Sequence, residues 1–339
     1  MHVRVSHVGS FPFKPEAQSV ELVVKGYVES GVNAPAYPQL RDFVRMFLEP
    51  YIEAGILDDV GGMYLVKDME GLKKPPELKP EIWEAELFVE ASKGVFKYLR
   101  APVTGAFTLA SNILLQPKAE DFSATALSDK QVVESLAAYV KNNLKYLASL
   151  GYNILFVDEP MLSVVVGARK VLLGYALEDI ADYLDYVYSG VTGERGIHVC
   201  GRISKPLFRT LVSVEELDVV NFEFYGTREN VQVLERELLE AHSKKLAPGI
   251  ASSKSMKVEP VEELLGILKE IVNRAGLNVD LVSADDGFRG LRDVAPETEL
   301  REICFNKLKR IREAVDRLVA GLKDPQSSDQ RYESAGGGI

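Results

Sequence analysis

The sequence predicts an α/β protein built as a single (β/α)₈ TIM barrel. Eight short β-rich runs alternate with longer helical patterns, which is typical of parallel strands joined by helices. A length of 339 residues is ordinary for one such barrel. The alternative is an open doubly wound sheet, which usually has a glycine-rich phosphate turn after its first strand. Here the first run ends Val8-Gly9-Ser10-Phe11-Pro12, which does not match that turn.

The strands are predicted from short apolar or β-branched runs followed by turn residues. The run at residues 153–157 is almost entirely apolar, as expected for a strand buried on both faces. The run at residues 62–66 is the weakest, and we expect it to be the second strand. The predicted strands are residues 3–8, 62–66, 101–105, 153–157, 196–199, 217–222, 245–250 and 279–283.

Three helices have clear end signals. Residues 128–150 begin with Ser128 and a Gln three positions later, which predicts a capping box, and Gly151 follows as a stop. Residues 260–275 begin with Pro and precede Gly276, and residues 298–322 form a long amphipathic pattern. We expect one barrel domain over residues 1–323. Residues 324–339 are rich in Ser, Gln and Gly, which predicts a flexible tail.

The composition narrows the class of protein. Forty Lys and Arg against 50 Asp and Glu give a net charge of −10, which argues against a nucleic acid or an anionic membrane as partner. The only cysteines are Cys200 and Cys304, so a disulfide framework is excluded and a reducing compartment is expected. We find no targeting or membrane-spanning pattern and expect a cytoplasmic protein.

Chemistry in a barrel of this kind lies where the strands end at their carboxyl termini. Each polar residue at these ends has an ordinary explanation as a cap or turn residue. Their joint appearance at seven strand ends predicts a catalytic site. They are Ser10, Thr104, Asp158 with Glu159, His198 with Cys200, Glu223, Ser252 to Lys254, and Asp285 with Asp286.

The pair His198 and Cys200 is the sharpest of these features. Positions i and i+2 of a strand face the same side, so both side chains can point at one metal ion. Imidazole and thiolate are good zinc ligands, and Glu223 on the next strand offers a third. The alternative is a buried histidine beside a small apolar cysteine.

Taken in order, the strand-end motifs resemble those of the C-terminal catalytic barrel of cobalamin-independent methionine synthase. The likeness runs from about residue 2 to residue 322. This length has room for one barrel, whereas the full-length enzymes of the family have two in tandem. The chain therefore resembles the single-barrel relatives found in archaea and some bacteria. The matching segments are 8–12 (VGSFP), 102–105 (PVTG), 157–160 (VDEP), 198–200 (HVC), 218–223 (DVVNFE), 248–250 (PGI) and 285–287 (DDG).

The resemblance implies a Zn²⁺ site formed by His198, Cys200 and Glu223. The fourth ligand of the family, a second cysteine, falls on Asp286. One Cys and two carboxylates carry the same total charge as two Cys and one carboxylate, so zinc can still bind, although the ligand shell is harder. The alternative is that Asp286 does not bind and the site is weak or lost. We expect Cys304 to pack in the last helix and not to replace the missing thiolate.

The resemblance also implies an acceptor and the residues that hold it. In the family the acceptor is homocysteine, held at its amino acid end by residues that match Gly9, Ser10 and Asp158, with Thr104 on the neighbouring strand. A glutamate of the family falls on Arg45. An arginine cannot face an ammonium group, but it can face a carboxylate or sulfonate.

The methyl donor is less well matched. The family stacks a methyl-folate on a tryptophan after the Pro-Val-Thr strand, but residues 108–112 have no aromatic side chain and the only tryptophan, Trp83, lies elsewhere. The acid–base histidine of the family falls on Lys254, which with Asp158 is a candidate catalytic residue. These differences leave a methyl-folate and a methyl-corrinoid protein open as donors.

The predicted function is zinc-dependent methyl transfer to homocysteine to form methionine. Alternatives are methyl or alkyl transfer to another small thiol, and a metal-free, non-catalytic companion subunit of a methionine synthase.

Overall fold

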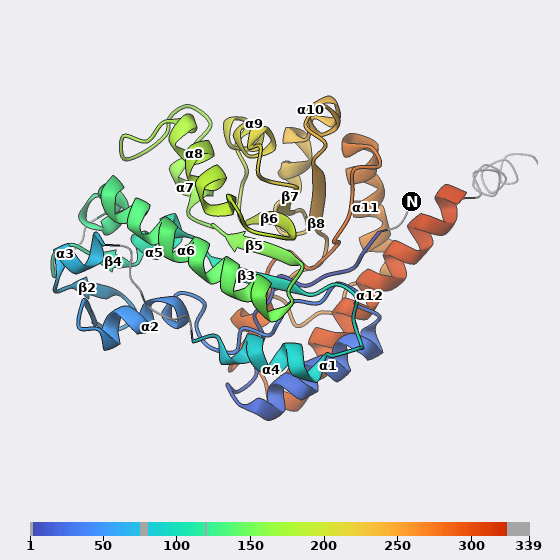
Figure 1. Cartoon of the computed structure of the whole chain (residues 1–339). Coiled ribbons are helices and arrows are strands. Elements are labelled where there is room, and N and C mark those ends of the chain that lie inside the picture. The colour runs from blue at the N-terminus through green and yellow to red at the C-terminus, as the bar shows by residue number, and fades with distance from the viewer. Residues whose placement is uncertain (1–2, 75–80, 119–120, 324–339) are drawn as a thin grey trace, which may run out of the picture.

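The central feature of the computed structural model is a ring of parallel strands (Figure 1). The structure describes residues 3–74, 81–118 and 121–323, so the predicted tail at residues 324–339 lies outside the described residues. Five strands form one parallel sheet in the order β3-β5-β6-β7-β8. They are β3 (Arg100–Thr104), β5 (Ile154–Asp158), β6 (Glu194–Val199), β7 (Val219–Glu223) and β8 (Lys245–Gly249).

Three further segments close the sheet into a barrel through isolated parallel bridges. They are residues 279–284 beside β8, residues 3–10, and residues 34–39 beside β3. All eight segments are parallel, which confirms the predicted fold class. The closing pairs are Leu246 with Val279, Gly249 with Ser283, Val5 with Val282, Ser6 with Ala34, Ser10 with Gln39, and Ala36 with Arg100.

The prediction for the second strand was wrong. Within residues 62–66, β2 (Tyr64–Val66) joins a separate three-stranded sheet with β1 (Leu57–Asp59) and β4 (Ile113–Leu114). The second barrel strand is instead the segment at residues 34–39, which contains two prolines. Proline has no N–H to donate, so this segment pairs only through isolated bridges and lacks the sequence pattern of a strand.

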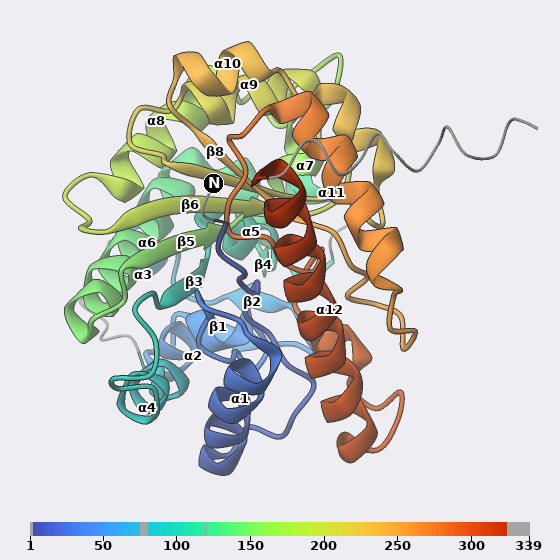
Figure 2. The ribbon, with the colours of Figure 1, turned by 90° about the vertical axis from the view of Figure 1, so that its right-hand side faces the viewer.

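In the described part of the chain, eight helices surround the barrel, and α12 lies along α11 and α1 (Figure 2). They are α1 (Ala17–Ser30), α4 (Trp83–Ala91), α6 (Lys130–Leu150), α8 (Leu177–Tyr188), α9 (Lys205–Ser213), α10 (Arg236–Ala241), α11 (Val261–Ala275) and α12 (Glu297–Lys323). Shorter helices lie in the connections. They are α2 (Arg45–Glu53), α3 (Met69–Leu72), α5 (Ala106–Ser111), α7 (Leu162–Val165), and the 3₁₀ turns η1 (Phe122–Ala124), η2 (Ala126–Ser128), η3 (Arg228–Val233) and η4 (Phe288–Leu291).

The predicted ends of the long helices are mostly correct. Gly151 ends α6 with a left-handed φ of 110°, as its position predicts. The start of α6 differs, because the cap is Asp129 and not Ser128, which lies in η2. The Asp129 carboxylate accepts hydrogen bonds from the backbone N–H groups of Gln131 and Val132 at 3.0 and 3.4 Å. A charged cap acceptor suits the positive end of a helix.

An apolar cluster lies inside the barrel. Its largest member is Phe156 on β5, and the ring fits because the neighbouring strand has Gly196 opposite it. A Cβ atom at Gly196 would lie 2.2 Å from the ring carbons. The buried members of the cluster are Ala34, Ile154, Phe156, Val219, Ala247 and Leu281.

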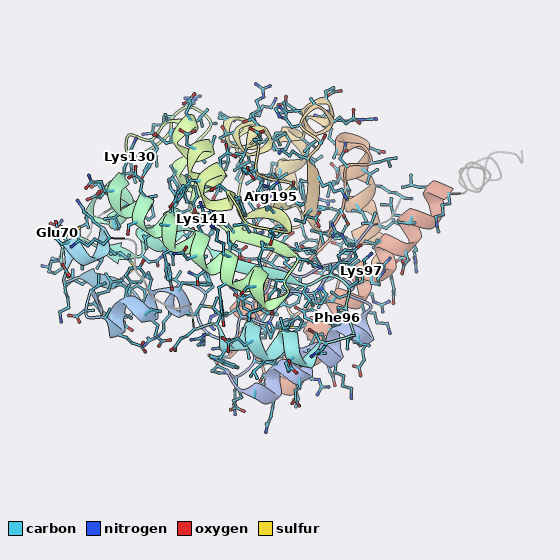
Figure 3. The ribbon with its side chains drawn as sticks, in the orientation of Figure 1. Glu70, Phe96, Lys97, Lys130, Lys141 and Arg195 are labelled. Carbon is cyan, nitrogen blue, oxygen red and sulfur yellow. The ribbon has the colours of Figure 1, made fainter. Side chains whose placement is uncertain are left out.

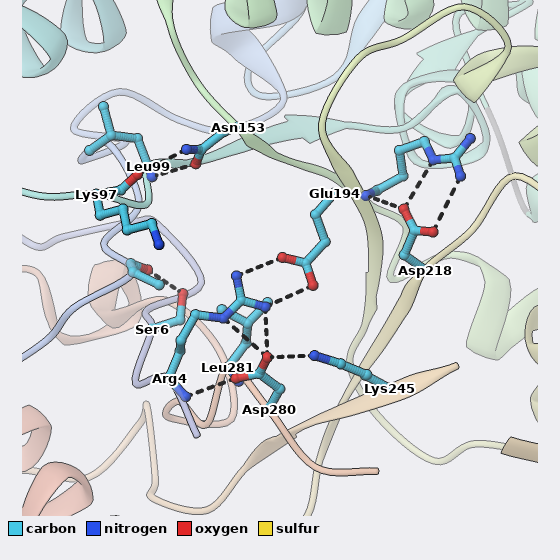
Figure 4. Close-up of polar contacts among 12 residues, drawn as sticks. Arg4, Ser6, Lys97, Leu99, Asn153, Glu194, Asp218, Lys245, Asp280 and Leu281 are labelled. Carbon is cyan, nitrogen blue, oxygen red and sulfur yellow. Dashed lines mark hydrogen bonds and ion pairs between the residues drawn. The ribbon is translucent and has the colours of Figure 1, made fainter. Parts of the chain in front are cut away.

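The amino-terminal ends of the strands are joined by ion pairs (Figure 4). Arg4 donates to Asp280 at 2.7 Å and to Glu194 at 2.7 Å, and Lys245 lies 3.2 Å from Asp280. This network links the first, fifth, seventh and eighth strands of the barrel, and contacts at this face serve stability in such folds. In the described part of the chain, no helix has the length and apolar character needed to cross a membrane.

The fit of Phe156 against Gly196 yields a stability prediction. Gly196→Ala is expected to lower the free energy of unfolding by about 1–3 kcal/mol, because the new methyl group overpacks the barrel interior. Denaturant unfolding measures the change. Gly266→Ala on α11 is the matched control, because nothing lies within 4 Å of its Cβ position, and it should stabilise the chain by about 0.5–1 kcal/mol. Equal stability of the two variants would contradict this account of the interior.

Candidate active site

The strand register brings three of the predicted site residues side by side. Thr104 pairs with Asp158 across β3 and β5, and Asp158 pairs with His198 across β5 and β6. Side chains at paired positions of parallel strands point to the same face. Phe156, two residues before Asp158, lies in the interior cluster, so all three side chains belong to the inner face at the carboxyl ends of the strands.

His198, Cys200 and Asp286 form a group that could hold a metal ion. One ligand atom from each lies within 4.8 Å of the others, and His198 Nε2 is 3.7 Å from Asp286 Oδ1. His198 is only 2% exposed, yet its Nε2 atom has no hydrogen-bond partner. A buried polar atom without a partner is costly, and a metal ion would satisfy it. An imidazole nitrogen, a sulfur and a carboxylate oxygen fit Zn²⁺.

Glu223, the other predicted ligand, lies beside this group rather than within it. It ends β7 and is buried, and its Oε1 accepts a hydrogen bond from the Thr227 hydroxyl. Its charge raises the pKa of both Cys200 and Asp286, so it is close enough to act on them. Glu223 is therefore a neighbour of the three-residue group, held in place by Thr227.

The site concentrates groups that would be anionic. Burial raises the pKa of Cys200 to about 12, and the charges of Asp286 and Glu223 add to this rise, whereas Lys254 opposes it. Burial also raises the pKa of Asp286 to about 6 and that of Asp158 well above its ordinary value. A divalent cation would stabilise the charged form of each of these groups.

Lys254 is exposed in the loop that follows β8. Its charge lowers the pKa of both Cys200 and Asp286, so its ammonium group acts on the metal-binding group. The structure therefore places this candidate acid–base residue at the rim that the sequence predicts.

The predicted substrate-binding residues have different surroundings. Gly9 has a φ of +148°, and a Cβ there would lie 2.8 Å from Pro102, so this position requires glycine. The Ser10 carbonyl accepts from Phe288 N–H at 2.7 Å, which joins Ser10 to the segment that carries Asp286. Asp158 Oδ1 is buried without a partner. A cationic substrate group could satisfy it.

The other two predicted substrate residues are engaged in contacts with the protein. The Thr104 hydroxyl donates to the Phe43 carbonyl at 2.6 Å. Arg45 begins α2, is half exposed, and binds Asp59 of β1 at 2.7 Å. Within the described residues, no hydrogen bond or ion pair joins Arg45 to the rim group.

Sequence reasoning missed Arg100 and Asn221, which lie inside the barrel below the rim. Arg100 Nη2 donates to Asn221 Oδ1 at 3.1 Å, and that oxygen is also 3.0 Å from His198 Nδ1. The alternation of side chains along each strand could have placed both residues inside the barrel. Arg100 stands four residues before Thr104, and Asn221 stands two residues before Glu223, so each shares the inner face.

A cavity of about 760 Å³ lies on the outside of the barrel between α6 and α8, at the end of α6 that begins with Lys130. Figure 3 labels Lys130 at this end of the helix. Lys130, Tyr175 and Asp179 are among the residues that line it. It contains none of the strand-end residues, so it is separate from the candidate active site.

The fold and the rim define a parallel eight-stranded barrel with a candidate metal centre at its catalytic face. A family model described as "Cobalamin-independent synthase, Catalytic domain" matches residues 74–304. The chain therefore belongs to this family, which confirms the resemblance seen in the sequence. Methionine synthase from Methanocaldococcus jannaschii is 24% identical over 306 residues, covering 87% of each chain.

Solved structures show the same fold. A B12-independent methionine synthase from Shewanella sp. W3-18-1, in complex with selenomethionine, superposes with a TM-score of 0.71 at 13% identity, covering 95% of this chain and 99% of that one. A putative vitamin-B12 independent methionine synthase from Listeria monocytogenes gives 0.67 at 17% identity, covering 94% and 99%. At these identities the likeness establishes the fold.

The ligand set can be tested by metal analysis of dialysed protein. We expect about one zinc ion per chain, lost in Cys200→Ser and Asp286→Ala and kept in Asp286→Cys, because thiolate and carboxylate are both zinc ligands. Cys304→Ser is the matched control, since Cys304 is buried on α12 and should leave the zinc content unchanged. Zinc retention in Asp286→Ala would remove this residue from the ligand set.

The raised pKa of Cys200 predicts how zinc affinity depends on pH. With a pKa of about 12 the thiol is protonated at neutral pH, so zinc binding must release its proton. Apparent affinity should therefore rise about tenfold per unit between about pH 7 and pH 9. Titration calorimetry in two buffers of different ionisation enthalpy counts the protons released. An affinity independent of pH in this range would mean that Cys200 is not a ligand.

Proposed function

We propose that the chain is a zinc-dependent S-methyltransferase that transfers a methyl group to the thiol of homocysteine and so forms methionine. Membership of the cobalamin-independent synthase family supports the reaction class. The observation that carries the metal dependence is the unpartnered Nε2 of His198 beside Cys200 and Asp286. In this proposal His198, Cys200 and Asp286 hold the ion, and Glu223, which lies beside them, would have to turn from Thr227 to become the fourth ligand.

When bound, zinc supplies the Lewis acidity that lowers the pKa of the substrate thiol. A thiolate is the nucleophile that a methyl transfer needs, because a free thiol is mostly protonated at neutral pH. The thiol loses its proton, and the sulfur electron pair forms the new S–CH₃ bond. The bond between the methyl group and the donor breaks, and the donor keeps that electron pair.

The chain's own residues would hold the amino acid end of the substrate. Asp158 Oδ1 is buried and unpartnered, which suits an ammonium group. Gly9 and Ser10 bring backbone groups to the same rim. Arg45 has no part in this arrangement because Asp59 engages its guanidinium.

Lys254 would act as the acid–base residue of the reaction. It is exposed on the loop after β8, where it can reach a donor that approaches the carboxyl ends of the strands from solvent. Its charge also stabilises the thiolate form of Cys200, since it lowers the pKa of that group.

We infer that the donor is a methyl-corrinoid protein rather than a methyl-folate. Residues 108–111 lie in α5 and include no aromatic side chain. The aromatic residue of α5, Phe107, is buried against Tyr175 and Tyr183 and offers no free face to stack a pterin. Trp83 is at the start of α4, where the Arg41 guanidinium lies 5.8 Å from its ring. No described contact brings this ring to the rim residues. Transfer to another small thiol is the second candidate, because position 45 lacks the glutamate that the family uses to hold homocysteine and Arg45 is engaged by Asp59 instead.

The proposed reaction can be tested with ¹³C-methyl donors and zinc-loaded protein, with methionine detected by mass spectrometry. We expect labelled methionine from homocysteine and a methyl-corrinoid donor, and none from methyl-folate. Lys254→Met should lower the rate by about 10²-fold at unchanged zinc content, because general acid–base catalysis is lost. Lys257→Met is the control, since Lys257 is exposed and pairs with Glu263.

The outcomes separate the candidates. Product from 2-mercaptoethanesulfonate or another small thiol, with none from homocysteine, would reassign the acceptor. Zinc-loaded protein that methylates no thiol from either donor would overturn the enzyme proposal and favour a companion subunit.

A further inference from the structure

A buried arginine lies inside the barrel, and the proposed reaction does not use it. Arg100 at the start of β3 is 0% exposed, and its guanidinium carbon is 3.7 Å from the centroid of the Phe156 ring. Its Nη2 atom donates to Asn221 Oδ1 at 3.1 Å. Burying a cation costs several kcal/mol unless other interactions offset it. The position of Arg100 below the metal-binding group therefore needs a physical reason.

The contacts of Asn221 fix the orientation of its amide group. An arginine side chain can only donate hydrogen bonds, so the Asn221 atom that faces Arg100 must be the oxygen. On its other side Asn221 Nδ2 donates to the Ala247 carbonyl at 2.5 Å, and a carbonyl can only accept. Because Arg100 can only donate and the Ala247 carbonyl can only accept, the oxygen and nitrogen of the Asn221 amide cannot be exchanged.

This orientation determines where the neutral His198 ring carries its proton. Asn221 Oδ1 lies 3.0 Å from His198 Nδ1, and an amide oxygen only accepts, so Nδ1 must be the donor. A neutral imidazole ring carries a single proton, so a ring that donates through Nδ1 has no proton on Nε2. Nε2 is then left with a free lone pair, 3.7 Å from Asp286 Oδ1.

We propose that Asn221, locked by Arg100 and the Ala247 carbonyl, is a positioning residue that holds His198 in the Nδ1–H form and so presents Nε2 to the metal ion. The tautomer is a property of the chain alone, whereas its role in metal binding rests on the zinc site of the proposed function. Hydrogen bonds of this kind behind a ligating histidine set the ring orientation and strengthen the ligand.

Two substitutions of Asn221 by residues of similar size distinguish the effect of losing the hydrogen bond from the effect of changing the side-chain volume. Asn221→Leu keeps much of the volume and removes the acceptor. Asn221→Asp keeps an oxygen acceptor for both His198 and Arg100. The matched control is Asn143→Leu on α6, because Asn143 is also fully buried and its Nδ2 donates to a backbone carbonyl, that of Tyr139.

The first measurement is the tautomer of His198 in metal-free protein labelled with ¹⁵N-histidine, by two-bond ¹H–¹⁵N correlation. His198→Gln assigns the signals. We expect the Nδ1–H form in the wild type, in Asn221→Asp and in Asn143→Leu, and the Nε2–H form or a mixture in Asn221→Leu. An Nε2–H wild type, or an unchanged tautomer in Asn221→Leu, would overturn the proposal.

The second measurement is zinc affinity by competition with a chromophoric chelator, with thermal unfolding to check that each variant is folded. Asn221→Leu should bind zinc about 10–100-fold more weakly, while Asn221→Asp and Asn143→Leu should keep wild-type affinity. An equal loss in Asn143→Leu would show a general effect of removing a buried amide and would overturn the proposal. Methyl transfer is measured in neither experiment, so failure of the proposed reaction leaves these results unchanged.

Discussion

The shared register of the parallel strands is the constraint on which the rest of the structure depends. Because Thr104, Asp158 and His198 are paired across three neighbouring strands, their side chains meet at one face without any loop to place them. Closure of the ring through isolated bridges then brings Ser10 and the segment of Asp286 to the same rim. The opposite ends of the strands carry ion pairs that Asp280 makes with Arg4 and Lys245. At the carboxyl ends, by contrast, Asp158 Oδ1 and His198 Nε2 are buried without a partner.

The inside of the barrel combines an apolar cluster with three hydrogen-bonded polar residues, Arg100, Asn221 and His198. Phe156 fills the space that Gly196 leaves, and the Arg100 guanidinium stacks on that ring below the site. Burial raises the pKa of Asp158 and of Asp286 at the rim. The positive charge of Arg100 opposes this rise for both carboxyl groups. Arg100 thus offsets part of the cost of an anionic rim and also orients Asn221.

Much of this arrangement was accessible from the sequence, because strand alternation and strand ends are local signals. The His198-X-Cys200 spacing and the motif at Asp286 predicted the residues that the fold brings together. The second strand was missed because residues 34–39 hold two prolines and pair only through bridges. The partner of Arg45 could not be predicted, since Asp59 belongs to a small sheet outside the barrel.

A carboxylate in the proposed ligand set, that of Asp286, and the lack of an exposed aromatic side chain on α5 lead to the same view of the proposed methyl donor. Carboxylate is a harder ligand than thiolate and donates less charge, so a zinc ion held by Asp286 would keep more of its Lewis acidity. The bound thiol would lose its proton readily, but the thiolate would be a weaker nucleophile. A weaker nucleophile requires a donor with a better leaving group, and a methyl-corrinoid meets that need better than the tertiary amine of a methyl-folate. A protein-borne donor would also account for the exposed position of Lys254 at the rim.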